Sequence, residues 1–316
     1  MKLSVAMCTW NGAAYVEEQL VSIAAQTRRP DEVVICDDAS NDATPRVLER
    51  FSVTAPFTVR IFRNRERLGT TRNFEQAIKR CTGDVIFLSD QDDVWRPEKI
   101  AVLAERFVRD IRIGCLFTDA ALHGGTLWEH IGFDESERSR VHRGKAFDVL
   151  IRHNVATGAT MAFRAKWRDT LLPIPEEIVH DRWIALILSA ASRVDCIEQP
   201  LIDYRAHPQQ QIGPGEAAAG IDRWIEMARE TGAAEWKRRA KELRTVLQRL
   251  ESLDNAPRRN VVQLGKFVAH METRAALPPQ RWRRIPTILR ELATLRYFRH
   301  SKHFLSAAKD LFWRVD

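Results

Sequence analysis

The sequence predicts an α/β protein with a mainly parallel sheet flanked by helices and an α-helical C-terminal extension. Over the first 120 residues, short apolar runs alternate with amphipathic stretches, which is the pattern of βαβ units. Beyond Pro214 the strand signal disappears, and residues 217–253 and 259–312 have the pattern of helices. We therefore expect two domains, a sheet domain over residues 1–213 and a basic helical extension over residues 214–316.

The first 120 residues predict five strands with helices between them. The strands are the apolar runs at 3–8, 33–36, 58–62, 85–88 and 113–118. The first helix has an apolar stripe whose spacing covers one helix face, formed by Val16, Leu20, Ile23 and Ala24. The next two helices contain Val47, Leu48 and Phe51, and then Phe74, Ala77 and Ile78.

The later part of the predicted sheet domain has weaker signals. The polar stretch 123–145 is predicted to be a long loop or lid, a kind of segment that is more often functional than not. Residues 155–163 alternate in polarity around Gly158, which marks either a close approach or a bulge. A helix is predicted to start near Asp181, and a last strand to end near His207.

Composition excludes several classes of protein. Of the 316 residues, 45% are hydrophobic and 29% are charged, which is ordinary for a globular chain. The longest apolar candidate, 183–192, is well short of the roughly 20 residues that span a bilayer, so an integral membrane protein is not expected. No export signal is visible at the N-terminus, and we expect a cytoplasmic protein. The five scattered cysteines predict buried thiols in a reducing compartment.

Charge is concentrated at the C-terminal end. Residues 256–316 contain 13 Lys and Arg against 4 Asp and Glu, whereas residues 1–210 contain 28 against 30. Aromatic side chains such as Trp282 and Phe304 lie among these basic residues. The mixture favours a peripheral contact with an anionic membrane surface on the inner face of the cytoplasmic membrane, although an ordinary solvated surface explains any one helix equally well. No nucleic-acid partner is expected, because no nucleic-acid-binding motif accompanies the charge.

Polar and acidic residues follow three strands of the predicted sheet. The strands end in Thr9-Trp10-Asn11, in Asp37-Asp38 and in Asp90-Gln91-Asp92-Asp93. Ligands of open parallel sheets bind at the carboxyl ends of the strands. Crowded carboxylates there are best explained by a divalent cation, Mg²⁺ or Mn²⁺, bound to a phosphate. Alternatively, Asp37-Asp38 caps a helix and Asp90–Asp93 forms a solvated turn.

The motifs together resemble those of a known enzyme family. They are Cys8-Thr-Trp-Asn-Gly12, Asp37-Asp-Ala-Ser-Asn-Asp42, Gly69-Thr-Thr-Arg-Asn-Phe74, Ser89-Asp-Gln-Asp-Asp-Val-Trp95, His180-Asp-Arg-Trp183 and Tyr204-Arg-Ala-His207. In this order they resemble a family 2 glycosyltransferase of the GT-A fold, a Rossmann-like mainly parallel sheet flanked by helices. The motif Ser89-Asp-Gln-Asp-Asp-Val-Trp95, which we call the acidic segment, is most similar to the rhamnosyltransferase-like subgroup. The resemblance covers about residues 1–213.

The resemblance implies roles for individual residues. Asp181 corresponds to the general base, which takes the proton of an acceptor hydroxyl while inversion occurs at the anomeric carbon. Asp92 corresponds to the metal ligand, and His207 to a further metal or phosphate contact. The nucleotide-sugar site is expected to comprise Thr9, Trp10, Asn11, Asp37, Asp38, Arg72, Asn73, Asp90 and Gln91. Acceptor contacts are expected from Trp95, Gly158 and His180.

Several of these residues have an equally simple structural interpretation. Asn73 is also a good helix cap, and Trp95 is also a good core residue. A lone histidine such as His207 is more often hydrogen-bonded than a ligand. His180 stands where the wider family more often has an acid, which leaves its role open.

The sequence therefore predicts an inverting, metal-dependent glycosyltransferase. The expected reaction moves a sugar such as rhamnose, from dTDP-rhamnose, to a glycan or lipid-linked acceptor in cell-surface polysaccharide synthesis. A nucleotidyl or phosphoryl transferase is the alternative enzyme, although the chain has neither G-x-x-x-x-G-K-[ST] nor G-x-G-x-x-G. The alternative from another class is a catalytically silent glycan- or membrane-binding protein on the same fold.

Overall fold

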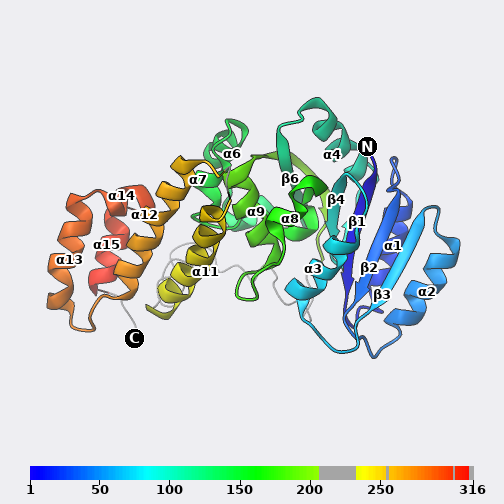
Figure 1. Ribbon diagram of the computed structural model, residues 1–316, viewed down its shortest axis with the longest axis horizontal. Helices are drawn as coiled ribbons and strands as arrows, with labels where there is room; N and C mark the ends of the chain where they lie inside the picture. Colours follow the sequence, from blue (N-terminus) through cyan, green and yellow to red (C-terminus); the bar gives the residue numbers. More distant parts are fainter. Residues whose placement is uncertain (206–232, 254–255, 302, 313–316) are drawn as a thin grey trace. The chain divides into compact units, whose positions relative to one another are not determined.

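The computed structural model describes residues 1–205, 233–253, 256–301 and 303–312 (Figure 1). The chain separates into two compact units, Met1–Pro214 and Gly215–Asp316. The domain boundary predicted between residues 213 and 214 lies outside the described residues, as does His207. We describe each unit separately.

Unit 1 is built on one mixed sheet of nine strands within the described residues. Eight of them follow one another across the sheet: β3 (Thr58–Arg63), β2 (Glu32–Asp37), β1 (Leu3–Thr9), β4 (Val85–Ser89), β8 (Ala162–Arg164), β6 (Ile113–Leu122), β9 (Arg193–Asp203) and β5 (Val94–Trp95). The ninth, β7 (Gly125–Thr126), pairs with β6. The first four are parallel, and β9 is parallel to β6, which confirms the predicted mainly parallel sheet.

The central strands are continuous apolar runs because helices cover the sheet. Every residue of β1, β2 and β4 is buried, as expected of parallel strands that are covered on both faces. The crossover helices are α1 (Val16–Ala24), α2 (Thr44–Thr54), α3 (Thr70–Arg80) and α4 (Lys99–Arg109). The predicted apolar stripe of the first helix is confirmed, since Val16, Leu20 and Ile23 are fully buried.

The prediction of a long loop over 123–145 is wrong. This stretch contains β7, α5 (Leu127–Ile131) and α6 (Glu135–His142). Thr126 and Glu129 form a reciprocal capping box that starts α5, and the Asp134 side chain accepts a hydrogen bond from the Glu137 N–H at the start of α6. A few buried apolar side chains, among them Trp128 and Phe133, anchor a segment whose remaining residues are mostly polar.

The remaining elements of unit 1 lie between β6 and β9. They are α7 (Ala146–Leu150), the 3₁₀ turns Gly158–Thr160 and Ala165–Trp167, α8 (Arg168–Leu171) and α9 (His180–Ala191). The predicted helix start near Asp181 is therefore confirmed. All five cysteines are free and buried, as predicted. Burial raises the pKa of each thiol, for example that of Cys36 to about 11 and that of Cys81 to about 12.

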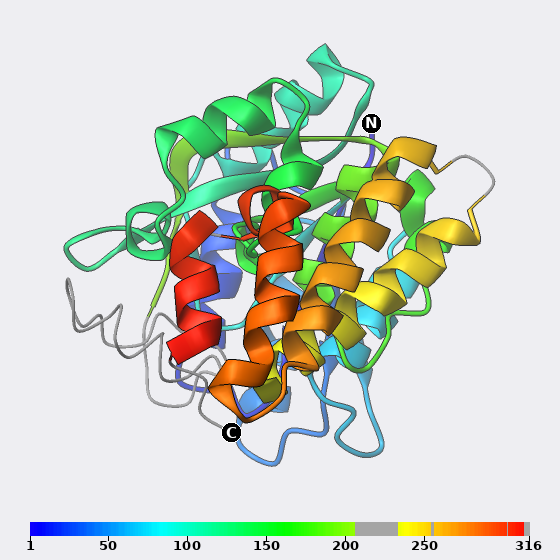
Figure 2. The same cartoon turned by 90° about the vertical axis from the view of Figure 1, so that its left-hand side faces the viewer.

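Unit 2 is helical where it is described, as predicted. Its helices are α11 (Ala233–Glu251), α12 (Arg258–Ala275), α13 (Arg281–Ala293), α14 (Arg296–His300) and α15 (His303–Phe312). Helices α11 and α12 lie side by side, as Figure 2 shows. In the described part of the chain, no helix is long and apolar enough to cross a bilayer.

The interior of unit 2 is unusually polar. His270, Arg274, Arg284, Glu291 and Asp310 are each at most 5% exposed. Arg274 donates two hydrogen bonds to the Asp310 carboxylate, at 2.6 and 2.8 Å, and Tyr297 donates a third at 2.7 Å. Because each buried polar group has a partner, the network is compatible with a stable fold.

Candidate active site

The predicted meeting of three strand ends is confirmed by the sheet register. Thr9 at the end of β1 lies opposite Asp37 at the end of β2, and Met7 lies opposite Ser89 at the end of β4. The residues after these strands therefore share one edge of the sheet, which we call the carboxyl edge. It is the edge at which ligands bind in open α/β sheets.

The turns after β1 and β2 are tied to each other. Asp37 accepts hydrogen bonds from the hydroxyls of Thr9 and Ser40, at 2.9 and 2.5 Å. The Asn11 N–H donates to the Ser40 hydroxyl, and the Asn11 side-chain oxygen accepts from the Asn41 N–H, each at 2.9 Å. Asn11 has φ of 47°, a left-handed conformation that Asn tolerates better than most residues. These contacts fix the half-buried Asn11 side chain at the carboxyl edge.

Asp38 holds the loop that follows β3. Its carboxylate accepts hydrogen bonds from the N–H groups of Leu68 and Gly69, at 2.7 and 2.8 Å, and from the Asn64 amide at 2.8 Å. Neither Asp37 nor Asp38 caps a helix, because α2 begins only at Thr44. The capping alternative for this pair is therefore wrong.

Asn73 and Arg72 lie in the next helix and have protein partners. Asn73 is inside α3 rather than at its cap; its amide donates to the Cys36 carbonyl at 2.8 Å and its oxygen accepts from Asn64 at 2.9 Å. Arg72 pairs with Glu176 at 2.9 Å and with Glu75 at 3.2 Å. Asn73 therefore shapes the carboxyl edge, while Arg72 lies in an ion-pair group beside it.

Gln91 fastens the acidic segment to the turn after β1. Its side chain accepts from the Trp10 N–H at 2.8 Å and donates to the Trp10 carbonyl at 3.0 Å. A Cβ atom on Gly12 would lie 2.1 Å from the Gln91 side-chain oxygen, so this close contact needs glycine. The Trp10 ring is half-buried and is covered by the Arg67 guanidinium, 3.4 Å from the ring centroid.

Four carboxylates interact at the carboxyl edge: Asp90, Asp92, Asp93 and Asp181, the acidic cluster. Burial and the charges of the other three raise the pKa of Asp90 well above its usual range. Burial and the Asp92 charge raise the pKa of Asp93 to about 7, and neither oxygen of its carboxylate has a hydrogen-bond partner among the described residues. The same four carboxylates, after burial, raise the pKa of Tyr204. Such crowding of carboxylates favours the binding of a further cation.

Lys99 supplies positive charge beneath the acidic cluster. Its side chain is fully buried, and the ammonium donates to the Ala159 carbonyl at 2.6 Å. The ammonium also lies 3.6 Å from the centroid of the Trp95 ring, which is 2% exposed. Burial lowers the pKa of Lys99, and the charges of Asp93 and Asp90 oppose that shift. Trp95 therefore packs as a core residue beneath the cluster.

Asp181 lies in the first turn of α9 and is held by the segment before β8. The Gly158 N–H donates to one carboxylate oxygen at 3.1 Å, and the Asn154 amide donates to the other at 3.2 Å. A Cβ atom on Gly158 would lie 2.9 Å from the His180 ring and 3.3 Å from the Asp181 Cβ atom. Glycine is required here because α9 approaches this turn so closely.

His180 packs under the same turn. It is 4% exposed and stacks on Phe74, with 3.9 Å between the ring centroids. Neither ring nitrogen has a hydrogen-bond partner in the described structure, and burial lowers the pKa of the imidazole. A neutral ring in this position supports the Asp181 backbone by packing.

A sequence model of the family "Glycosyl transferase family 2" matches residues 4–170, just over half of the chain. The chain belongs to glycosyltransferase family 2. The matched region contains the acidic segment and the segment that holds Asp181, although Asp181 itself lies beyond it.

Relatives of this family 2 chain match parts of it. An uncharacterized glycosyltransferase of Nostoc is 32% identical over 117 residues, which are 37% of this chain and 36% of that protein. An uncharacterized protein of Mycobacterium bovis is 34% identical over 210 residues, 65% of this chain and 59% of the relative. The dTDP-rhamnosyl transferase RfbG of Shigella flexneri is 37% identical over 98 residues, 30% of this chain and 34% of RfbG. The chain thus spans less than two thirds of each relative.

Two solved structures establish the fold. TarS 1–349 of S. aureus in complex with UDP-GlcNAc is 15% identical, with a TM-score of 0.62 over 98% of this chain and 88% of that one. The mannosyltransferase PcManGT of Pyrobaculum calidifontis, in complex with GDP-Man and Mn²⁺, is 21% identical, with a TM-score of 0.56 over 97% of this chain and 77% of that one. The fold is the GT-A glycosyltransferase fold.

Several residues of this family 2 site have no role in the prediction from sequence. Asp93 was visible in the acidic segment but was given no role. Arg205 donates to the carbonyls of Asp92 and Asp93, at 2.7 and 3.3 Å, and holds the acidic segment against the end of β9. Lys99 and Asn154 are brought to the site only by the fold, so their positions along the chain do not indicate a role. Tyr204 and Arg205 were visible as part of the motif before His207.

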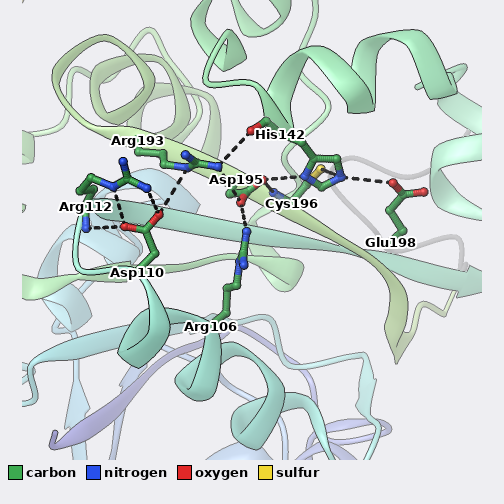
Figure 3. Close-up of polar contacts among 8 residues, drawn as sticks. All are labelled: Arg106, Asp110, Arg112, His142, Arg193, Asp195, Cys196 and Glu198. Carbon is green, nitrogen blue, oxygen red and sulfur yellow. Dashed lines mark hydrogen bonds and ion pairs between the residues drawn. The ribbon is translucent and has the colours of Figure 1, made fainter.

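A second polar cluster lies between α4, α6 and β9 (Figure 3). Its residues His142, Asp195 and Cys196 place a nitrogen, an oxygen and a sulfur within 4.8 Å of one another, which is ligand spacing for a metal ion. However, the buried Asp195 carboxylate is already paired with Arg106 at 2.5 Å and with His142 at 2.8 Å. Burial also raises the pKa of the Cys196 thiol, which disfavours the thiolate form that binds metals. We interpret this cluster as an ion-pair network that joins three elements.

Proposed function

We propose that this chain transfers a glycosyl group from a nucleotide-diphosphate sugar to a hydroxyl group of a glycan or lipid-linked acceptor, with inversion at the anomeric carbon. The observation that supports it most is the acidic cluster at the carboxyl edge, where Asp90 and Asp93 have raised pKa values. A crowded group of like charges is stable only when protons or cations compensate them. A donor diphosphate carried with a divalent cation supplies that compensation.

The nucleotide is proposed to bind over the turns after β1 and β2. Asn11 and Trp10 are half-buried there and offer an amide and an indole ring to the base or ribose. Thr9, Asp37, Asp38, Asn73 and Gln91 hold these turns in place through the hydrogen bonds described above. Arg72 reaches a diphosphate only if it leaves Glu176, a pair at 2.9 Å that is largely exposed and therefore weak.

The residues of the acidic cluster fit a divalent cation. Carboxylate oxygens are the ligands that Mg²⁺ and Mn²⁺ prefer, and the unpartnered oxygens of Asp93 show that the cluster has acceptor capacity left over. We propose Asp92 as the protein ligand, with Asp90 toward the ribose. His207, outside the described residues, is proposed as a further ligand. A divalent cation held by these residues would supply positive charge to stabilise the departing diphosphate.

Asp181 is proposed as the general base. The Gly158 N–H and the Asn154 amide orient its carboxylate, so it is positioned to accept the proton of an acceptor hydroxyl group. As that oxygen attacks, the bond between the anomeric carbon and the diphosphate oxygen breaks on the opposite face. Gly158 and the buried His180 are proposed to shape the floor of the acceptor site. Trp95 is buried, and we propose that its ring supports this floor from below.

The donor sugar is proposed to be rhamnose, delivered as dTDP-rhamnose to a growing cell-surface polysaccharide. The partial match to the dTDP-rhamnosyl transferase RfbG supports this choice. The acceptor is proposed to be reached from the cytoplasm, at the inner face of the membrane.

A thermal-shift panel tests the proposal. Purified full-length chain is heated with dTDP, UDP, GDP, CDP or ADP, each with and without Mn²⁺ or Mg²⁺. A ligand of the native state raises apparent stability by RT ln(1 + [L]/Kd), so a metal-dependent shift with dTDP is expected. A selective shift with UDP or GDP would overturn the rhamnose assignment alone. No shift with any nucleotide would overturn the transferase assignment and favour a binding protein.

A further inference from the structure

Helix α13 exposes an apolar face to solvent. Trp282, Ile285 and Leu289 are 67%, 43% and 59% exposed. They are spaced by three and four residues, so they lie on one side of the helix, and we call them the α13 apolar face. An amphipathic helix of a water-soluble domain ordinarily turns such a face inward.

The opposite side of α13 packs inward through the apolar Ile288 and through two polar groups, Arg284 and Glu291. The buried Arg284 donates to the carbonyls of Pro278, Pro279 and Asp310, at 2.7, 2.6 and 3.0 Å. The buried Glu291 bonds His270 at 2.7 Å and Arg296 at 2.8 Å. The orientation of the helix is therefore fixed by hydrogen bonds that cannot be made if it rotates. Its apolar face stays outside.

Exposed arginines flank the α13 apolar face. Arg281, Arg283 and Arg290 are exposed, and the Arg283 guanidinium lies 4.9 Å from the Trp282 ring centroid. Glu291, which is buried and paired, is the one acidic residue of the helix. The exposed side of α13 is thus apolar in the middle and purely basic at its borders.

Exposed apolar side chains are concentrated in this part of the chain. Fourteen large apolar side chains are exposed among the described residues, and half of them lie within residues 282–312. These seven are Trp282, Ile285, Leu289, Leu295, Phe304, Leu305 and Phe312. Those of unit 1 are spread over separate elements. The three on α13 share one helix face, and an exposed apolar patch of this kind marks an interaction site.

We propose that α13 lies in the surface of an anionic lipid bilayer, with Trp282, Ile285 and Leu289 at the boundary of the acyl chains and Arg281, Arg283 and Arg290 against lipid phosphates. A tryptophan with an apolar ring and a polar N–H is well suited to that depth. A second copy of this chain is a poor occupant, because two such faces would bring their arginines together. This membrane proposal depends on the proposed function in one respect only, namely that the acceptor is reached at a membrane.

Vesicle co-sedimentation of the full-length chain tests this. The vesicles contain phosphatidylcholine alone or a mixture with phosphatidylglycerol. We expect binding to the mixture, and at least about tenfold weaker binding when Trp282, Ile285 and Leu289 are all replaced by Ser. The matched control replaces three exposed apolar residues of unit 1, Val53, Val108 and Ile111, which should leave binding unchanged. Replacing Arg281, Arg283 and Arg290 by Gln should remove the preference for phosphatidylglycerol.

Three outcomes would overturn the proposal. They are an absence of wild-type binding to the anionic vesicles, equal binding by the apolar triple variant, and loss of binding in the unit 1 control as well. A dimer in light scattering that disappears in the apolar triple variant, without vesicle binding, would assign the face to a second copy. Circular dichroism checks that each variant is folded. The arginine variant tests the contacts with lipid phosphates independently of the apolar face. Nucleotide shifts should be the same in all variants, so failure of the donor proposal is detected separately.

Discussion

Asp181 has a carboxylate whose orientation is fixed by three donors. One of its oxygens accepts from the Gly158 N–H at 3.1 Å, and the other accepts from the Asn154 amide at 3.2 Å and from the Arg182 N–H. Carboxylate oxygens have several lone-pair sites, so these bonds leave acceptor capacity on the group. Asp181 can therefore keep its orientation and still accept a proton from a substrate.

Asp181→Asn should abolish transfer while nucleotide binding persists. The amide oxygen can still accept from the donors on its side, but the side chain can no longer take a proton, so transfer should fall by about 10²- to 10⁴-fold. Transfer is measured with radiolabelled donor, and binding by thermal shift with metal. Asp203→Asn, at an exposed ion pair with Arg96, is the matched control and should keep both. Equal loss of transfer and binding in Asp181→Asn would remove the assigned role.

Asp92→Asn should remove the metal dependence of nucleotide binding. The amide is a weaker ligand for Mg²⁺ or Mn²⁺ than a carboxylate, so the difference in melting temperature with and without metal should shrink. His142→Gln is the control, because it disrupts the second polar cluster, where His142 faces Asp195 at 2.8 Å. If His142→Gln abolishes the metal response and Asp92→Asn does not, the cation binds at the second cluster instead.

At the scale of elements, α4 links the two halves of the site. Its first residue, Lys99, faces Asp90 and Asp93 of the acidic segment and also bonds the carbonyl of Ala159, next to the glycine that holds Asp181. One buried ammonium therefore connects the proposed donor side with the proposed acceptor side. Its removal should affect the fold before it affects chemistry.

Lys99→Met should lower the free energy of unfolding by about 1–3 kcal/mol, since it leaves the Ala159 carbonyl without its buried donor and removes the positive charge that acts on Asp93 and Asp90. Urea denaturation measures the change, and Lys79→Met on the exposed side of α3 is the control. Added Mn²⁺ should restore part of the loss, because a divalent cation takes over the compensation. A change below about 1 kcal/mol would show that Lys99 does not balance the cluster.

The sequence predicted some elements and not others for physical reasons. The central strands were predictable because a parallel strand covered on both faces is a continuous apolar run, as in Val33–Cys36. Strands β5 and β7 have two residues each, too few for any periodic signal. The pattern of 123–145 predicts a loop because its anchoring apolar residues are sparse. Helix α5 depends instead on the capping box of Thr126 and Glu129.

The same distinction holds for the site. Thr9, Asp37 and Asp90 were predictable because the ends of adjacent parallel strands must meet. Lys99 and Arg205 were given no role because their partners are backbone carbonyls distant in sequence, 60 residues away for Lys99 and 113 for Arg205. The hydrogen bonds that occupy Asp38 and Asn73 are likewise products of the fold, which no pattern of letters reveals.

At the scale of the whole molecule, the two units are stabilised differently. Unit 1 has a large apolar core around its sheet, whereas the end of unit 2 has a small apolar cluster of Leu277, Ile288, Tyr297 and Ala307. Beside that cluster, the buried polar network joins α12, α13 and α15. One member of that network is His270, and burial holds the pKa of its imidazole below the usual range.

Unit 2 should lose stability as the pH falls below about 6.5. Burial lowers the pKa of His270, and the nearby Arg274 adds to this, while Glu291 and Asp310 oppose it. Since the folded pKa lies below that of the unfolded chain, the unfolded chain binds more protons in this range. The free energy of unfolding should fall by at most about 1.4 kcal/mol per pH unit.

Thermal unfolding followed from pH 8 to pH 5 measures this dependence. His270→Gln keeps a hydrogen-bonding side chain but cannot titrate, so its curve should be flatter than that of the wild type below about pH 6.5. His123→Gln, outside the unit, is the control for general effects of removing a histidine. Parallel curves for wild type and His270→Gln would refute the assignment.

The burial of all five cysteines has a practical consequence. With their thiol pKa values raised by burial, the native chain should react slowly with maleimides and alkylating agents near neutral pH. The native thiols should therefore add little background signal in site-directed labelling. A single cysteine introduced at Trp282 or at Val53, both well exposed, would accept a fluorescent or spin label without prior removal of native thiols. Such a probe could report the depth and motion of one chosen helix in the otherwise unmodified protein.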